Sequence, residues 1–399
     1  MNYDKILATR TSNIKASAIR ELLKLAANPG MISLGGGLPS PDSFPLDLVR
    51  DLTDKVLHKY NSAALQYDAT EGFTPLRKAL VEYLREREIP ANLENVYITS
   101  GSQGFLDSIG KLLISPGDYV AVEGPTYLAA LQAFNAYEAK YLQIETDDEG
   151  LVPESLGEIV KSYPVKFVYT VPTFQNPSGK TIGTKRREAI AAIIKKYDVL
   201  LVEDDPYSAL RYSGEAQPTI KSMAPENVVY ASTFSKIFAP GLRIGFFVAP
   251  EAIGRWMVIV KQGVDLNTCT FSQALATEYL LGGYVPQQVK KNIEIYRPKL
   301  GAMLDALETY LPNDYKWSKP EGGMFLWVVG PKGLDMEDVS KRTLERGVGF
   351  VPGKFFFPNN DGIETMRLNF TNVSEDQIKH AIKILSEVLN EENEFAAAN

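Results

Sequence analysis

Two apolar runs flank a polar turn in the stretch Ala231-Ser-Thr-Phe-Ser-Lys-Ile-Phe-Ala-Pro-Gly-Leu-Arg-Ile-Gly-Phe-Phe-Val248. The β-branched and aromatic residues 228–230 that lead into it predict a buried strand, and residues 244–248 predict a second one. Lys236 lies between them with apolar neighbours on both sides, so we expect its amine to be partly buried. Burial lowers the pKa of an amine, which leaves more of it neutral and able to attack a carbonyl carbon.

The residues around this lysine carry groups suited to a phosphate. Thr233 and Ser235 supply hydroxyl donors, and Arg243 supplies a planar cation with paired N–H groups. An amine beside a phosphate site is what pyridoxal phosphate requires, because this cofactor has an aldehyde that binds an amine and an anionic tail that must be anchored. An exposed lysine in a surface turn is the alternative that this stretch leaves open when it is taken alone.

Composition and charge restrict the class of protein. The chain has 399 residues, of which 45% are hydrophobic and 23% are charged, and its formal net charge is −7. This length predicts two domains, or one large domain with a smaller one attached, and the acidic balance argues against nucleic acid as a partner. No apolar run reaches the roughly 18 residues of a membrane span, and the N-terminus lacks the apolar segment of a signal peptide. We therefore expect no membrane partner and a cytoplasmic location.

Cysteine and histidine are scarce. Cys269 is the only cysteine, and His58 and His380 are the only histidines. One cysteine excludes an internal disulfide and a site of several thiolates, and two distant histidines give little support to a zinc enzyme or a histidine-based hydrolase. We expect no metal site, and we expect a cofactor to supply the reactive group.

Strand-like and helix-like segments alternate through the middle of the chain. We expect strands at 96–99, 119–123, 141–144, 166–171, 199–203, 228–231 and 244–248, with helices in most of the intervals. Apolar strands that alternate with helices predict an α/β fold with a mostly parallel sheet covered by helices on both faces. After about residue 250 the pattern becomes helical with a few strands, which predicts a smaller α+β domain. A short helix is expected over 11–30, and the tail from 391 is expected to be frayed.

Polar residues follow several of these strands directly, at 100–103, 173–176, 204–207 and 232–236. The carboxyl ends of parallel strands meet at one edge of a sheet, and α/β proteins bind their ligands there. In the first of these segments, the N–H groups of a new helix, with Ser102 and Gln103, predict an anion site. Ordinary N-capping by Ser102 is the compatible alternative.

The strand at 199–203 ends in three successive acids, at 203–205, and a tyrosine lies two residues further on. A carboxylate buried at a strand end is costly unless it pairs with a cation, and the protonated nitrogen of a pyridine ring is such a cation for Asp204. Tyr207 would then reach the phenolate oxygen of the same ring. Solvated acids in a loop are the alternative, which suits Glu203 or Asp205 better than all three.

Other residues have both a functional and a structural interpretation. Asn176 is expected either to donate to the same phenolate oxygen or to close an Asx turn. Tyr127 is expected either to stack on the pyridine face or to belong to the core. Arg367, in an apolar strand, is expected either to grip a substrate carboxylate or to form a structural salt bridge. The glycines 35–37 let the backbone approach a ligand or, as the sequence alone favours, another chain segment.

Together these motifs resemble the class I/II aminotransferases, which are pyridoxal phosphate enzymes of fold type I, and most of all the group with 2-aminoadipate and kynurenine aminotransferases. The resemblance covers nearly the whole chain. It rests on Ser33-Leu-Gly-Gly-Gly-Leu-Pro39, Tyr67 with Glu71-Gly72, Ser100-Gly-Ser-Gln103, Asn176-Pro-Ser-Gly179, Glu203-Asp-Asp-Pro-Tyr207, Ser235-Lys236 with Arg243, Glu321-Gly-Gly-Met-Phe325, and Arg367.

The resemblance implies a role for each residue around the cofactor ring. Lys236 would condense with the aldehyde and then move the proton. Asp204 would hold the pyridinium nitrogen, Tyr207 and Asn176 would hold the phenolate oxygen, and Tyr127 would stack on the ring.

It also implies how the phosphate is bound. The phosphate-binding residues would be Ser102, Gln103, Ser235 and Arg243. Tyr67 would reach the phosphate of the neighbouring subunit's cofactor, which implies a homodimer with shared active sites. Thr233 stands where the family often has serine, and the hydroxyl group is retained.

For the substrate, Arg367 would bind the α-carboxylate, with Asn176 beside it. Arg20, in the expected N-terminal helix, would meet the distal carboxylate of glutamate or 2-aminoadipate, unless it is an exposed arginine paired with a nearby acid. Gly36 and Gly37 would line the side-chain pocket through their backbone.

The implied activity moves an amino group from an L-amino acid to a 2-oxo acid by a ping-pong mechanism, with glutamate and 2-oxoglutarate as one pair. The other substrate would be 2-aminoadipate, kynurenine, or an aromatic or branched-chain amino acid. The implied fold has a large domain at 46–290 with a mostly parallel seven-stranded sheet, a small domain at 291–399, and an N-terminal arm at 1–45 that adds to the small domain. A β-lyase or decarboxylase on the same fold stays open, as does the less favoured effector domain of a transcription regulator.

Overall fold

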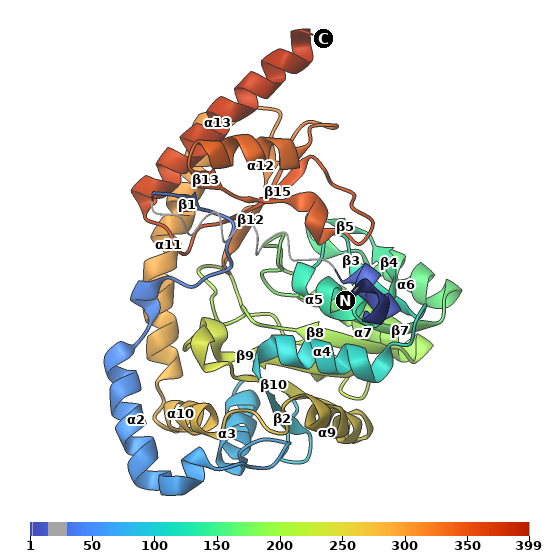
Figure 1. Ribbon diagram of the computed structural model, residues 1–399, viewed down its shortest axis with the longest axis vertical. Helices are drawn as coiled ribbons and strands as arrows, with labels where there is room; N and C mark the ends of the chain where they lie inside the picture. The colour runs from blue at the N-terminus through green and yellow to red at the C-terminus, as the bar shows by residue number, and fades with distance from the viewer. Residues whose placement is uncertain (2, 15–29, 399) are drawn as a thin grey trace.

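The computed structural model describes residues 1, 3–14 and 30–398 of the chain (Figure 1). Its centre is a seven-stranded sheet with the order β2 (Val96–Thr99), β10 (Gly245–Val248), β9 (Val228–Thr233), β8 (Leu200–Asp204), β7 (Val165–Thr170), β3 (Tyr119–Glu123) and β4 (Lys140–Ile144). Only β10 runs antiparallel to its neighbours in this sheet, and the other paired strands are parallel. The predicted α/β fold with a mostly parallel seven-stranded sheet is confirmed.

Helices cover both faces of this sheet, because its strands are apolar on both sides and must be shielded from water on both. One face packs against α4 (Gly101–Leu113), α5 (Leu128–Asn135) and α9 (Glu251–Asp265). The other packs against α3 (Thr74–Arg85), α6 (Pro153–Ser162), α7 (Thr184–Tyr197) and α10 (Thr270–Leu281). Alternate residues of one strand therefore lie in different clusters: Tyr169 and Val202 face α5, whereas Val168 and Leu201 face α7.

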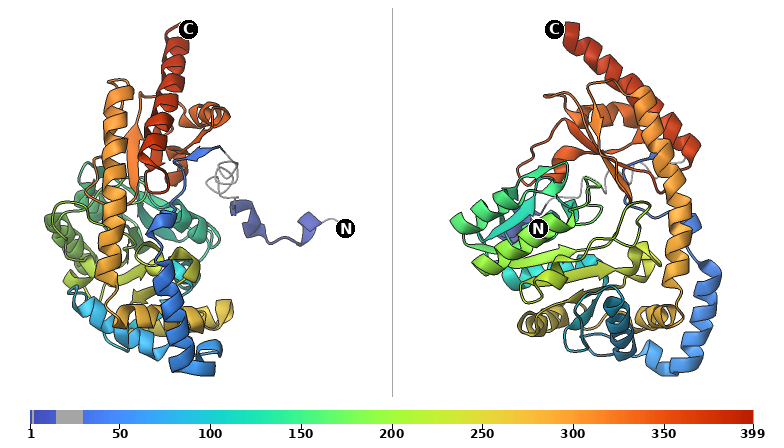
Figure 2. Two further views of the ribbon diagram at one scale, coloured as in Figure 1. Left: turned by 90° about the vertical axis from the view of Figure 1, so that its left-hand side faces the viewer. Right: turned by 180° about the vertical axis from the view of Figure 1, so that it is seen from behind.

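A second, four-stranded sheet forms the core of the smaller part of the molecule. Its order is β11 (Lys316–Trp317), β12 (Phe325–Val329), β15 (Thr365–Asn369) and β14 (Val351–Pro352), and its paired strands are antiparallel. The helices α12 (Met336–Glu345) and α13 (Glu375–Ala398) pack on this part, and the long helix α11 (Val285–Tyr310) connects it to the large sheet (Figure 2). Pro298 lies inside α11.

The segment near the N-terminus joins the smaller part. Strand β1 (Ile32–Ser33) pairs in parallel with β13 (Val348–Gly349), which brings the glycines at 35–37 between the two sheets. The helix α2 (Leu46–Tyr60) then runs along the large part. This arrangement suits the expected arm at 1–45, although the domain boundaries at residues 45 and 290 stay a prediction.

Two expectations at the chain ends need comment. The expected helix over 11–30 begins with a short 3-10 helix at Thr9–Asn13, and most of its range, including Arg20, lies outside the described residues. The prediction of a frayed tail from residue 391 is wrong, because α13 continues to Ala398. Arg342 forms ion pairs with Glu391 and Glu392, so acids that read as a solvated tail bind the helix α12 instead.

In the part of the chain that the structure describes, no helix has the length and hydropathy to cross a membrane.

Candidate active site

The lysine at 236 lies in a turn that β9 and β10 hold in place. The short 3-10 helix η5 (Phe234–Lys236) follows β9 directly. The Thr233 hydroxyl accepts a hydrogen bond from the Ser235 N–H group at 3.1 Å and donates to the Ile244 carbonyl at 3.0 Å. Thr233 thus caps the turn and ties it to the segment that leads into β10, which sets the direction of the Lys236 side chain.

The amine of Lys236 points into the molecule. Its Nζ donates to the Gly37 carbonyl at 2.9 Å, and the side chain is half-buried. Burial, together with the positive charges of Arg367 and Arg243, lowers the pKa of Lys236 to about 8. The exposed lysine of the alternative interpretation is therefore wrong, and a larger neutral fraction is available for attack on a carbonyl carbon.

Asp204 is the last residue of β8 and is 2% exposed. Its Oδ2 accepts a hydrogen bond from the Tyr169 hydroxyl at 2.8 Å, whereas its Oδ1 is buried without a partner among the described residues. Burial raises the pKa of Asp204 to about 7, the Tyr169 hydrogen bond opposes the shift, and the charge of Asp205 adds to it. An unpaired buried carboxylate oxygen is costly, so this site requires a donor or a cation that the described residues do not supply.

Asn176 connects two other predicted residues. Its Nδ2 donates to the Tyr207 hydroxyl at 3.4 Å, and its Oδ1 accepts from Arg367 Nη1 at 2.7 Å. All three side chains are buried. The amide is thus oriented by the site, and the alternative of an Asx turn is not needed to explain it. The structure brings together the two residues that we expected to reach the same oxygen.

Arg367 lies in β15 and is 2% exposed. Its Nη2 donates to the Gly35 carbonyl at 2.5 Å, and the guanidinium lies over the rings of Phe325 and Phe356 at 4.3 and 4.9 Å. Burial lowers its pKa to about 10. Among the described residues, its Nε has no hydrogen-bond partner and its guanidinium takes part in no ion pair. Arg367 therefore does not form the alternative structural salt bridge with any described residue, and its guanidinium is able to bind an anion.

The glycine segment contacts both functional cations. Gly37 accepts from Lys236, and Gly35 accepts from Arg367. A Cβ atom at position 37 would lie 3.2 Å from the Phe325 ring, so the backbone approaches the site closely. The sequence alone favoured contact with another chain segment, and that contact is made with the site residues themselves. Gly36 lies buried between these two glycines.

The start of α4 forms a cradle for an anion. The helix begins at Gly101, so Ser102 lies in the first turn and the capping alternative for Ser102 is wrong. A Cβ atom at Gly101 would lie 2.4 Å from Nη2 of Arg243, and one at Gly245 would lie 2.6 Å from the carbonyl carbon of Gly101. Only glycine permits this approach, which places a guanidinium beside the free N–H groups of a helix start.

The other residues expected at the phosphate lie around this cradle. Arg243 is exposed, and its guanidinium donates to the Ser100 and Pro240 carbonyls at 3.3 Å each. Gln103 is exposed and its amide donates to the Ala129 carbonyl at 3.3 Å, while Ser102 and Ser235 are half-buried.

Tyr127 and Tyr67 differ in their surroundings. Tyr127 immediately precedes α5 and is half-buried, and burial and then the charge of Asp204 raise its pKa. Tyr67 follows the short 3-10 helix η4 (Asn61–Leu65) and is 78% exposed. Within a single chain, the structure places the Tyr67 ring in solvent.

Tyr169 is a residue of this site that the sequence analysis missed. It is fully buried in β7, and its hydroxyl holds Asp204. The available signal was a hydroxyl group in an apolar strand that pairs with the strand of Asp204, but strand pairing is not readable from the sequence.

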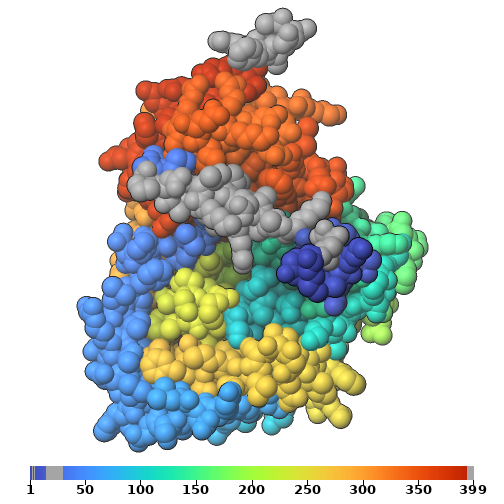
Figure 3. Space-filling view, in the orientation of Figure 1, coloured from blue at the N-terminus to red at the C-terminus, as the bar shows by residue number. Residues whose placement is uncertain are grey.

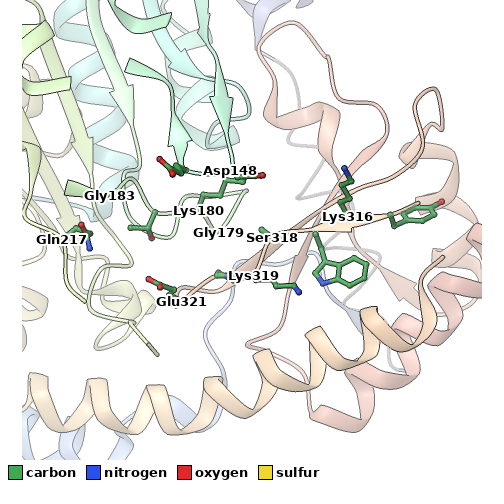
Figure 4. Close-up of a pocket in the computed structure, with 14 residues that line it drawn as sticks. Asp148, Gly179, Lys180, Gly183, Gln217, Lys316, Ser318, Lys319 and Glu321 are labelled. Atoms are coloured by element: carbon green, nitrogen blue, oxygen red, sulfur yellow. Dashed lines mark hydrogen bonds and ion pairs between the residues drawn. The ribbon is translucent and has the colours of Figure 1, made fainter. Parts of the chain in front are cut away.

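A cavity lies between the loop at 179–183 and the segment at 315–321 (Figure 4). Lys180 and Gly183 line it on one side, and Lys316, Lys319 and Glu321 line it on the other. None of the predicted site residues lines this cavity, which lies where the loop after Asn176 meets the segment before β12. Among the described residues, no group of three histidine, cysteine or acidic side chains is placed to hold a metal ion.

Residues 30–385 match the family model described as aminotransferase class I and II. The chain belongs to this family. It is 49% identical to aromatic-amino-acid aminotransferase 1 of Thermococcus litoralis, over 98% of this chain and 96% of the relative.

Two solved aminotransferase structures are also similar. The kynurenine aminotransferase of Pyrococcus horikoshii, solved with PMP, is 47% identical over 98% of both chains, with a TM-score of 0.95. The α-aminoadipate aminotransferase LysN of Thermus thermophilus, solved with N-(5′-phosphopyridoxyl)-L-leucine, is 34% identical over 98% of this chain and 99% of the other, with a TM-score of 0.92. The chain is thus a pyridoxal-phosphate-dependent aminotransferase of fold type I.

The residues of this aminotransferase fit its cofactor. The unpaired Oδ1 of Asp204 is an acceptor for a protonated ring nitrogen, and the amine of Lys236 has a lowered pKa, as attack on an aldehyde requires. Arg243 lies against Gly101, and the first N–H groups of α4 beside it would be able to donate to a phosphate.

Proposed function

We propose that this site transfers an amino group between L-amino acids and 2-oxo acids by a ping-pong mechanism, with glutamate and 2-oxoglutarate as one pair. The observation that carries the proposal is the buried guanidinium of Arg367, which has no carboxylate partner among the described residues and whose charge acts on the amine of Lys236. Amino acids and 2-oxo acids share one anionic group, the carboxylate next to the reacting carbon. A single buried arginine can therefore bind both kinds of substrate in turn.

Pyridoxal phosphate, when bound, supplies the aldehyde that accepts the amino group and a ring that withdraws electrons from the substrate α-carbon. Asp204 would accept the ring N–H through its Oδ1, which keeps the positive charge on the ring. Tyr207 and Asn176 would donate to the ring oxygen, and Tyr127 would pack on the ring face.

The phosphate would lie in the cradle at the start of α4. The N–H groups there, with the side chains of Ser102, Gln103, Ser235 and Arg243, combine a partial positive charge with a full one. Arg243 already lies against Gly101, so it would need little reorganisation to bind the phosphate.

Lys236 would act as the base for the proton on the substrate α-carbon. Because its pKa is about 8, its Nζ can take up and release a proton near neutral pH. The Gly37 carbonyl, 2.9 Å from Nζ, would orient the amine whenever it is free.

Aromatic side chains near Arg367 favour aromatic donors. Its guanidinium lies between Phe325 and Phe356, and Trp327 packs edge-to-face on Phe356 at 5.8 Å. Relatives are named for aromatic amino acids, kynurenine and 2-aminoadipate. We therefore propose broad specificity that includes aromatic, branched-chain and 2-aminoadipate substrates, with Gly36 and Gly37 along the side-chain pocket and Arg20 at a distal carboxylate.

A homodimer would explain the exposed apolar residues near Tyr67. The exposed fractions of Tyr67, Leu65 and Leu266 are 78%, 71% and 60%. The loops that carry them adjoin, because Thr270 donates to the Gln66 carbonyl at 2.8 Å. On the face shown in Figure 3, α2 lies beside α10, and α9 lies beyond α10; α9 ends before Leu266 and α10 begins after it. We propose that a second copy covers this surface and that Tyr67 reaches the cofactor phosphate of the partner.

A panel of amino donors with 2-oxoglutarate as the acceptor tests the proposal through the glutamate formed. We expect plots of reciprocal initial rate against reciprocal donor concentration to give parallel lines at different concentrations of 2-oxoglutarate, as ping-pong kinetics require. Release of ammonia and a 2-oxo acid without any acceptor would support elimination instead. Glutamate formation that is absent for every donor would contradict the proposed pair.

A further inference from the structure

Tyr169 and Asp204 project from the same face of the large sheet. Tyr169 in β7 pairs with Val202 in β8, and Asp204 lies two residues further along β8, so the alternation of side chains places both on one side. The Tyr169 hydroxyl donates to Asp204 Oδ2 at 2.8 Å. The tyrosine is fully buried and packs edge-to-face on Phe134 at 5.8 Å, which leaves its ring little freedom to move.

The two carboxylate oxygens of Asp204 differ in their hydrogen-bond partners. Oδ2 is engaged by Tyr169, and Oδ1 has no partner among the described residues. A hydroxyl that donates to a carboxylate favours the ionised form and fixes the plane of the group. We propose that Tyr169 is the positioning residue for Asp204: its hydroxyl keeps that carboxylate ionised and turns the free oxygen toward the ring nitrogen of the cofactor. The inference rests on the proposed role of Asp204.

The surroundings of Asp204 make this support necessary. Burial raises the pKa of Asp204 to about 7 although the Tyr169 hydrogen bond opposes the shift, and the charge of Asp205 acts in the same direction as burial. Tyr127 before α5 and Tyr207 after β8 also feel the charge of Asp204. Without the Tyr169 donor, Asp204 would bind a proton more tightly, and its Oδ1 would hold the proton that an ionised carboxylate leaves on the ring nitrogen of a bound cofactor. A neutral ring nitrogen would withdraw fewer electrons.

A tyrosine–aspartate pair in β9, the strand beside β8, and the loop after β8 provides a matched control for Tyr169 and Asp204. Tyr230 in β9 is 3% exposed, and its hydroxyl donates to Asp205 Oδ2 at 2.9 Å. Asp205 differs from Asp204 because its other oxygen, Oδ1, accepts from the Ser208 N–H group at 3.0 Å. Tyr230→Phe therefore removes the same kind of bond from a neighbouring carboxylate whose two oxygens both bind groups of the chain in the wild type.

The experiment compares Tyr169→Phe with Tyr230→Phe in the complete enzyme. The first readout is the dissociation constant of pyridoxal phosphate from the apoenzyme, and the second is the 15N NMR signal of a cofactor labelled at the ring nitrogen. We expect Tyr169→Phe to weaken cofactor binding about tenfold, which corresponds to about 1.4 kcal/mol, and to move the signal toward that of a neutral pyridine. Tyr230→Phe should leave both readouts as in the wild type.

A third readout is the pH midpoint of the visible absorbance of the bound cofactor. A positive ring lowers the proton affinity of the Lys236 nitrogen once it is bonded to the cofactor, so Tyr169→Phe should raise the midpoint. If that variant does not fold, 3-fluorotyrosine placed only at position 169 keeps the shape and makes the hydroxyl a stronger donor, and the midpoint should then fall.

A protonated ring in both wild type and Tyr169→Phe, or equal changes in the two variants, would overturn the inference and leave the role of Asp204 intact. A neutral ring nitrogen in the wild type would overturn both that role and the inference. An unchanged midpoint with 3-fluorotyrosine would count against Tyr169 in the same way.

Discussion

Replacement of Arg367 by methionine should separate binding of the substrate carboxylate from stability of the fold. Two effects of the change oppose each other in the free enzyme. The Asn176 amide oxygen and the Gly35 carbonyl lose the donors that now lie at 2.7 and 2.5 Å, and each loss costs about 1–3 kcal/mol. Removal of a buried charge without a carboxylate partner returns several kcal/mol. We therefore expect the free energy of unfolding to stay within about 2 kcal/mol of the wild-type value.

The same variant should lose activity on amino acids. A buried, hydrogen-bonded charge pair that loses one partner costs about 2–5 kcal/mol, so kcat/KM should fall by a factor of about 30 to about 5000. The loss should depend on the carboxylate of the substrate. Phenylalanine and phenethylamine share the aromatic side chain and the amino group, but only phenylalanine carries the anion.

The assay measures the half-reaction of the cofactor-loaded enzyme with each of these two compounds, together with urea unfolding of each variant. Arg367→Met should react far more slowly with phenylalanine and at an unchanged rate with phenethylamine. Equal losses on both compounds would refute a carboxylate-binding role for Arg367.

Arg187→Met is the matched structural control. Arg187 is also buried, but it donates to the carbonyls of Ile182, Pro172 and Pro218 and to the Thr173 hydroxyl at 2.7 to 3.1 Å, and it lies 3.8 Å from Glu203. Its removal leaves a buried acid without its cation, so we expect about 3–5 kcal/mol of lost stability. A loss of that size in Arg367→Met as well would show that Arg367 is a structural residue.

The remaining predictions concern Lys236, Tyr67 and Arg20. Tyr67 is proposed to contact the partner subunit, and Arg20 lies outside the described residues. Lys236→Ala should abolish both amino transfer and the visible absorbance of the bound cofactor, and full turnover in this variant would remove the proposal. The rate at which the apoenzyme takes up pyridoxal phosphate should rise as the pH passes through about 8, because the neutral amine forms above the lowered pKa of Lys236; a midpoint near 10.5, the value of an ordinary lysine, would contradict a buried amine. Dimers mixed from Lys236→Ala and Tyr67→Ala chains should regain activity, since one of the two sites then has both residues intact, whereas no regain would place Tyr67 in its own subunit's site. Arg20→Ala should weaken glutamate and 2-aminoadipate more than aromatic donors in kcat/KM, and equal losses would argue against a distal-carboxylate role.

Much of the fold could be predicted because its signals are local. Apolar runs such as 199–202 and 228–231 are buried in the large sheet, so they appear in the sequence as nearly continuous hydrophobic segments. The end of the chain was mispredicted for the opposite reason. Glu391 and Glu392 look like solvated acids until Arg342, 49 and 50 residues away, is placed beside them.

The candidate site shows the same division. The chemistry of Lys236, Asp204 and Arg367 could be inferred from residue types, because a lysine after a strand and an arginine inside one each need an explanation. Their partners could not be inferred. The Gly37 carbonyl lies 199 residues from Lys236, and the Gly35 carbonyl lies 332 residues from Arg367.

Local sequence thus specifies which segments form strands and helices and which chemical groups each carries, because propensity and hydrophobic period act over a few neighbouring residues. Folding in three dimensions sets which oxygen of Asp204 is engaged, why the amine of Lys236 has a lowered pKa, and why Arg367 is left without a carboxylate partner among the described residues. These properties depend on charges and hydrogen-bond partners that come from distant parts of the chain, and the residues next to each group do not specify which distant groups will lie beside it.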